Sequence, residues 1–193
     1  EALLLLHDHD KLTETPPAAL ALSLREMSVG AETAEGWFLP ETWSFTAGDH
    51  DVDVLRRSHD AMQRLLMQLW AERDLDMPLT TPYEALILAS IVEKETGASE
   101  ERQQIAGVFL RRLTKGMRLQ TDPTVIYGLG DQYDGNLRRV HLRDRTNIYN
   151  TYAISGLPPT PIALPGEAAL RAVFSPDRSD TLYFVAKGDG THA

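Results

Sequence analysis

The sequence predicts an α+β fold: a mainly helical domain built around one buried helix at about residues 82–96, with a small β-sheet that includes about residues 181–187. The first observation is the segment 81–97, TPYEALILASIVEKETG, which is apolar on nearly every side and therefore typical of a helix inside a domain. The second is the segment TLYFVAK, which has the composition of a strand. The length of 193 residues suits a single domain.

Both ends of the predicted central helix carry sequence signals. Thr81 can cap the first turn, Pro82 suits the first helical position, and Glu84 follows Thr81 at the spacing of a capping box. Gly97 can take the left-handed conformation that ends a helix. These signals place the helix between residues 82 and 96.

Two carboxylates lie in the last turn of this helix, on different faces. Glu95 follows Leu88, Ile91 and Val92 at helical spacings and continues their apolar stripe, whereas Glu93 lies on another face. Glu95 is therefore the carboxylate that we expect to be withdrawn from water.

Loss of hydration and the negative end of the helix dipole both raise the pKa of a carboxyl group in this position. A raised pKa is what a general acid needs near neutral pH. The alternative is that Glu95 and Lys94 are ordinary solvated residues of a fraying last turn.

Further helices are expected at about residues 18–27, 51–72, 99–114 and 166–174. Arg111 and Arg112 are expected on a solvated face of the 99–114 helix. Another helix should start at Pro123, which keeps the preceding residue out of helical conformation. Thr121 or Asp122 could cap that helix, and Asp122 could equally lie in a substrate cleft.

Composition limits the possible partners. The net charge of −9 argues against nucleic acid or an anionic membrane surface as the main partner. The absence of cysteine excludes a disulfide framework, a thiol nucleophile and a thiolate zinc site. His7 and His9 are best explained as part of a solvated loop, so no metal site and no cofactor is expected. The apolar run at residues 2–6 is far too short to cross a bilayer.

Five sequence blocks occur together in a known order. They are EGWFLPETW at residues 35–43, ASIVEKET, LQTDPTVIYG, NTYAISGLPPTPIALPG and SPDRSDTLYFVAKGDGTH. In order and spacing these blocks resemble the MltG (YceG-like) family of endolytic murein transglycosylases. The resemblance covers residues 35–193 and leaves residues 1–34 weakly assigned within a single catalytic domain.

The resemblance implies a reaction and a set of site residues. Glu95 matches the catalytic acid of the family and would act as general acid and base on the MurNAc-GlcNAc bond of peptidoglycan. The C6 hydroxyl of the sugar would be the nucleophile, which gives a 1,6-anhydro-MurNAc end without water, metal or cofactor. Seven further residues are candidate substrate contacts: Gln120, Thr121, Asp122, Tyr127, Asn150, Tyr152 and Glu35.

The resemblance also implies a cellular setting. An N-terminal domain and a single-pass membrane anchor would lie upstream of this chain, at the periplasmic face of the bacterial inner membrane, near cell-wall synthesis proteins. Two rival functions remain open. One is a hydrolytic muramidase that uses Asp122 or Glu35 as a second carboxylate, and the other is a non-catalytic glycan-binding module.

Overall fold

Helices provide all the regular secondary structure in residues 6, 10–28 and 33–184, the part of the chain that the computed structural model describes. The longer helices are α2 (Pro17–Met27), α3 (Asp51–Ala71), α4 (Pro82–Glu95), α5 (Arg102–Thr114), α6 (Asp122–Leu129) and α8 (Glu167–Phe174). The shorter ones are η1 (Ser99–Glu101), η2 (Gly130–Gln132) and α7 (Arg139–Arg143).

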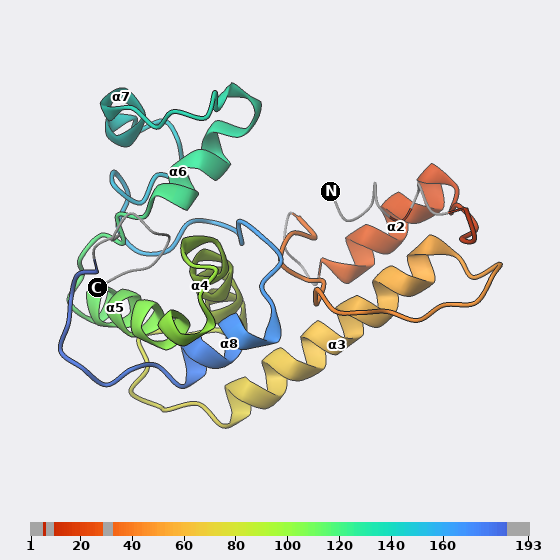
Figure 1. The fold of residues 1–193 in the computed structure, drawn as a ribbon, viewed down its shortest axis with the longest axis horizontal. Coiled ribbons are helices and arrows are strands. Elements are labelled where there is room, and N and C mark those ends of the chain that lie inside the picture. Colours follow the sequence, from red (N-terminus) through yellow and green to blue (C-terminus); the bar gives the residue numbers. More distant parts are fainter. Residues whose placement is uncertain (1–5, 7–9, 29–32, 185–193) are drawn as a thin grey trace.

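Helix α4 is the centre of the core, as the sequence predicted. All residues from Ala85 to Val92 are buried, and α4 packs against α3, α5, α6 and α8. Figure 1 shows α4, α5 and α8 grouped together, α2 lying along α3 on one side, and α6 with α7 projecting on another. Every face of α4 is covered, which explains its unbroken apolar composition.

The two ends of α4 differ in part from the prediction. Thr81 accepts a hydrogen bond from the Glu84 N–H at 3.2 Å. The Glu84 carboxylate, however, binds the N–H and hydroxyl of Thr80. At the other end the chain leaves the helix at Thr96, which is extended with φ −140°. The predicted left-handed cap at Gly97 is therefore wrong.

The predicted small β-sheet is also wrong. Among the described residues the structure contains no strand, and the only strand-like feature is an isolated bridge between Thr13 and His50. Residues 181–184 have no regular secondary structure, and the rest of the 181–187 segment lies outside the described residues. The carbonyls of Thr181 and Leu182 accept hydrogen bonds from Arg111 and Arg112 of α5. Arginine side chains thus take the place of a neighbouring strand.

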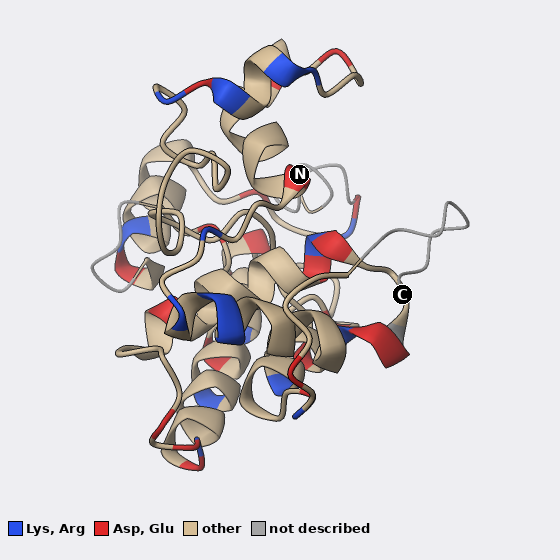
Figure 2. Ribbon diagram, turned by 90° about the vertical axis from the view of Figure 1, so that its left-hand side faces the viewer, with Lys and Arg blue, Asp and Glu red and all other residues tan. Residues whose placement is uncertain are grey.

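No helix in the described part of the chain is long and apolar enough to cross a membrane. Figure 2 shows acidic and basic residues interspersed along the helices that face the viewer. Charge in this view is mixed.

Candidate active site

Glu95, the last residue of α4, accepts a hydrogen bond on Oε2 from the hydroxyl of Thr121. Thr121 is the residue before α6 and is only 2% exposed. The glutamate is only partly buried, so one end of its side chain is held by protein while the residue still reaches the surface. A carboxyl group in this setting is oriented and accessible at once.

Two other threonines hold Thr121 in place. Its N–H donates to Thr151 Oγ1 at 3.1 Å, and its carbonyl accepts from the Thr124 hydroxyl at 2.7 Å. The hydroxyls of Thr124 and Thr151 lie 2.8 Å apart and are hydrogen-bonded. Thr124 and Thr151 are fully buried. The three threonines form a rigid polar cluster behind the glutamate, which we call the threonine cluster.

Gln120 stands beside this cluster in an unusual backbone conformation. Its φ is +52°, the one positive value at a non-glycine residue in the described part of the chain. Its N–H donates to the Thr151 carbonyl at 3.2 Å, and the residue itself is exposed. Left-handed conformations at ordinary residues cost free energy and are found at functional sites. The conformation turns the chain so that the next residue, Thr121, meets Glu95.

Asp122 and Tyr152 form a second pair at the site. The Tyr152 hydroxyl donates to Asp122 Oδ1 at 2.6 Å. Burial raises the pKa of Tyr152, and the hydrogen bond to Asp122 and the nearby negative charges of Asp122 and Glu95 raise it further. Asp122 is exposed, and the N-terminus of α6 has no side-chain cap hydrogen bond. Asp122 thus binds Tyr152 at the surface, and Thr121 binds Glu95.

Arg112 contradicts the expectation of a solvated face. It is 7% exposed, its Nη1 donates to the Leu119 carbonyl at 2.6 Å, and its Nε donates to the Leu182 carbonyl at 2.8 Å. Burial lowers the pKa of its guanidinium, while the negative charge of Glu95 is among the influences that raise it. The buried Arg112 guanidinium is therefore hydrogen-bonded to Leu119, the residue before Gln120.

A signal for Arg112 was present in the sequence. Arg112 follows Ile105 and Phe109 at spacings of seven and three residues, so it continues the buried stripe of α5. The same pattern singled out Glu95 on α4. Because arginine is charged, we expected Arg112 on the solvated face of the helix, and this prediction was wrong.

Glu93 differs clearly from its neighbour Glu95. Its Oε2 accepts from the Gly166 N–H at 3.0 Å, and its Oε1 lies 3.6 Å from Nη2 of Arg102. Ser90, one turn earlier, accepts from the Ile162 N–H at 3.0 Å. Glu93 and Ser90 thus attach the proline-rich loop before α8 to α4, which is a structural task.

Asn150 lies in the interior, next to α7. It is fully buried, and its amide Nδ2 donates to the carbonyls of His141, Leu142 and Asp144 at the end of α7. In this structure Asn150 therefore attaches α7 next to Thr151, and its predicted sugar contact stays a prediction.

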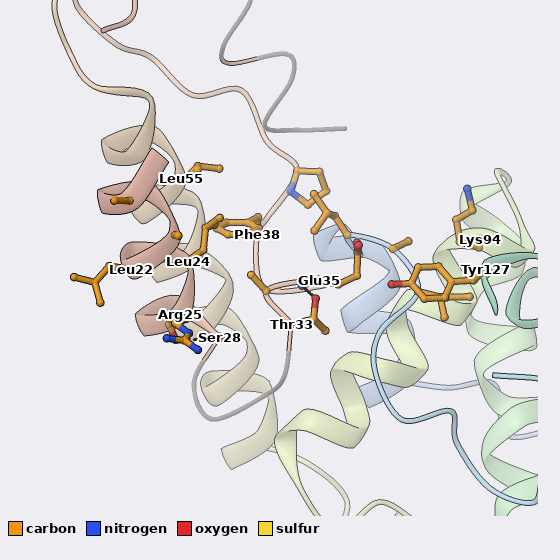
Figure 3. Close-up of a pocket in the computed structure, with 17 residues that line it drawn as sticks. Leu22, Leu24, Arg25, Ser28, Thr33, Glu35, Phe38, Leu55, Lys94 and Tyr127 are labelled. Atoms are coloured by element: carbon orange, nitrogen blue, oxygen red, sulfur yellow. Dashed lines mark hydrogen bonds between the residues drawn. The ribbon is translucent and has the colours of Figure 1, made fainter. Parts of the chain in front are cut away.

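Glu35 and Tyr127, the two remaining candidates, line a groove of about 1450 Å³. In Figure 3 their side chains point toward one another, with Lys94 close to Tyr127. Burial raises the pKa of Glu35. The pKa of Tyr127 is also raised, first by burial and then by the negative charge of Glu35. Because Lys94 precedes Glu95 and Tyr127 belongs to α6, the groove adjoins the Glu95 site.

The fold and the site together define a class of protein. It is a helical domain in which one carboxyl group ends the buried central helix beside an open groove, an arrangement suited to acid–base chemistry on an elongated ligand. The model of the YceG-like family matches residues 5–193. The chain therefore belongs to the YceG-like family, and the resemblance seen in the sequence is confirmed.

Relatives and a solved structure agree with this assignment. The chain is 34% identical over 158 residues to the endolytic murein transglycosylase of Bacillus subtilis, which covers 81% of this chain and 42% of that protein. It is 32% identical over 155 residues to the endolytic murein transglycosylase of Streptococcus pneumoniae, which covers 79% of this chain and 28% of the relative. The crystal structure of a yceG-like protein from Listeria monocytogenes superposes with a TM-score of 0.74 at 29% identity, over 100% of this chain and 62% of that one.

The chain thus spans less than half the length of these two curated relatives.

Proposed function

We propose that this domain cleaves peptidoglycan glycan strands internally by transglycosylation, at the MurNAc-GlcNAc bond, and leaves 1,6-anhydro-MurNAc ends. The observation that carries the proposal is Glu95, a carboxyl group at the end of a buried helix, oriented by Thr121 beside a groove. The names of the family's curated relatives support the same reaction class.

In the first half of the reaction Glu95 is the general acid. It gives its proton to the glycosidic oxygen while the bond between that oxygen and C1 of MurNAc breaks. In the second half the Glu95 carboxylate takes the proton of the C6 hydroxyl, and that oxygen bonds to C1. The glutamate ends protonated, as it began, and no water is consumed.

The neighbouring groups assist by holding the acid and the strand. The Thr121 hydroxyl keeps one carboxylate oxygen of Glu95 in a single orientation, which places the acid where proton transfer is needed. The exposed side chains of Gln120 and Asp122, with Tyr152 bound to Asp122, border the site as sugar contacts. Tyr127 and Glu35 extend the contact surface into the groove.

A hydrolytic muramidase is the second candidate, because the Asp122 carboxylate directly follows the residue that binds Glu95. In such an enzyme a second carboxylate would activate water or attack C1. The product then has a free reducing end. A glycan-binding module without activity would leave strands intact.

One experiment separates the three. Purified strands are incubated with the wild-type domain and with Glu95→Gln, and the products are identified by mass spectrometry. We expect anhydro-ended fragments from wild type and almost none from Glu95→Gln, which retains binding. Fragments with reducing ends would establish the muramidase instead, and intact strands with retained binding would establish the module.

The cellular setting is proposed from the family alone. We place the full-length protein at the periplasmic face of the inner membrane, held by an upstream single-pass helix and working beside cell-wall synthesis proteins. Fractionation of cells that express the full-length protein tests this proposal. Recovery in the cytosolic fraction would contradict it.

A further inference from the structure

The groove beside Glu95 has two chemically different halves. The half nearest the site carries Glu35, Lys94 and Tyr127. The other half is built from α2, whose Ala18, Ala21, Leu22 and Arg25 share one face at helical spacings. These four residues are exposed, and Leu22 retains 60% of its surface.

The opposite face of α2 explains why this face is left open. Leu20 and Met27 on that face are buried in a small core with Phe38 and Leu55. Helix α2 therefore packs against α3 without using Ala18, Ala21, Leu22 and Arg25. Phe38, Leu55 and Leu164 also line the groove, so the apolar lining continues beyond the exposed alanine and leucine side chains of α2.

Such a wall is poorly matched to a sugar chain. The sugar rings of such a strand carry oxygen or nitrogen substituents on nearly every carbon, and polar groups that lose water without a hydrogen-bond partner cost free energy. A short peptide of alanine and acidic residues matches better, because its methyl groups suit the apolar wall and its carboxylates suit cations. Arg25 supplies a cation on the α2 side, and Lys94 supplies another beside Glu95.

The polar end of the groove also suits peptide amides. The Tyr127 hydroxyl can donate to a peptide carbonyl, and the Glu35 carboxyl can accept from a peptide N–H. Figure 3 shows the Tyr127 hydroxyl directed toward Glu35.

We propose that the groove between α2 and the Glu95 site binds the peptide stem of the substrate. This inference rests on the proposed function, and it names the part of the substrate that the groove recognises. MurNAc bears the stem and also contains the C1 atom at which the bond breaks. A stem leaving the sugar at Glu95 enters the groove past Lys94, runs along the α2 wall, and brings carboxylates to Arg25.

The test uses two substrates, strands with intact stems and strands from which an amidase has removed the stems. Ala21→Trp fills the middle of the groove at an exposed position, so the domain should fold normally, which thermal unfolding checks. The matched control is Ala71→Trp, an exposed position at the end of α3 that does not line the groove.

We expect Ala21→Trp to lower kcat/KM on stem-bearing strands by about tenfold, a loss of about 1.4 kcal/mol of binding. Its kcat/KM on stripped strands should match wild type, and Ala71→Trp should match wild type on both. Lys94→Gln and Arg25→Gln should each lower kcat/KM on stem-bearing strands alone.

An unchanged rate of Ala21→Trp on stem-bearing strands would overturn the proposal. An equal loss on both substrates would also overturn it, because the groove would then bind glycan. If wild type cleaves neither substrate, the proposed function fails. Titration with the free stem peptide then tests by itself whether the groove binds the stem. Weaker peptide binding by Ala21→Trp than by Ala71→Trp supports the proposal, and equal binding contradicts it.

Discussion

Thr121 and Glu95 are joined by a hydrogen bond from the Thr121 hydroxyl to Glu95 Oε2, across a separation of 26 residues in sequence. The bond links the end of α4 to the start of α6. In the proposed mechanism this bond orients Glu95, and a general acid must be oriented as well as protonated.

Thr121→Val keeps the shape of the side chain and removes its hydroxyl. A hydrogen bond to a charged group is worth about 1.5–3 kcal/mol, so we expect kcat to fall roughly ten- to a hundredfold. KM should change little, and Thr121→Ser should recover most of the activity. Steady-state release of anhydro ends measures both parameters. Full kcat in Thr121→Val would show that this bond does not assist catalysis.

Glu95→Gln and Glu93→Gln should have opposite effects. Glu95→Gln cannot donate a proton at neutral pH, so we expect a loss of about a hundred- to ten-thousandfold in rate with normal folding. Glu93→Gln should keep most activity and lose roughly 1 kcal/mol of stability, because its bonds to Gly166 and Arg102 are structural. Activity assays and chemical denaturation measure the two effects. An inactive, stable Glu93→Gln would reverse our assignment.

Tyr152→Phe removes the 2.6 Å hydrogen bond to Asp122, and Asp122→Asn removes the negative charge that strengthens this bond. We expect both to lower activity less than Glu95→Gln does. The double variant should resemble either single variant, because residues that act through one contact are not additive. If Asp122→Asn were as inactive as Glu95→Gln, Asp122 would be the second carboxylate of a muramidase.

Arg112→Lys and Arg111→Lys form a matched pair. Both arginines hold the 181–182 segment, but only Arg112 also binds the Leu119 carbonyl beside Gln120. Lysine cannot reproduce the guanidinium fork. Both variants should be less stable, Arg112→Lys by about 3 kcal/mol. Well below their melting temperatures, only Arg112→Lys should show reduced kcat, and equal kcat in the two would contradict this role.

Glu35→Gln should change how stability depends on pH. Burial raises the pKa of Glu35 in the folded state, so its protonated form is favoured on folding. Its contribution to stability is therefore full below the unfolded pKa of about 4.3 and is lost as pH rises through the folded value. Glu35→Gln should gain stability relative to wild type at pH 7 but not at pH 4. Thermal melts at both pH values test this, and an equal difference at both would contradict it.

Local patterns correctly predicted the longer helices but not their surroundings. The apolar run of α4 and the stripe that ends at Glu95 follow from spacings of three and four residues, which a sequence displays directly. The 181–187 segment has the composition of a strand, yet a strand requires a partner. In the described part of the chain, arginines of α5 bind its carbonyls instead. No local pattern encodes that choice.

The sequence by itself determined the central helix, the position of Glu95 on it and the family blocks, because each depends on residues close together in the chain. Only the tertiary structure decided that Thr121 meets Glu95, that Arg112 turns inward, and that Asn150 attaches α7. It also decided that one face of α2 lines a groove beside the site. These contacts join distant segments, and their choice depends on how whole helices pack and on which buried polar groups then need a partner.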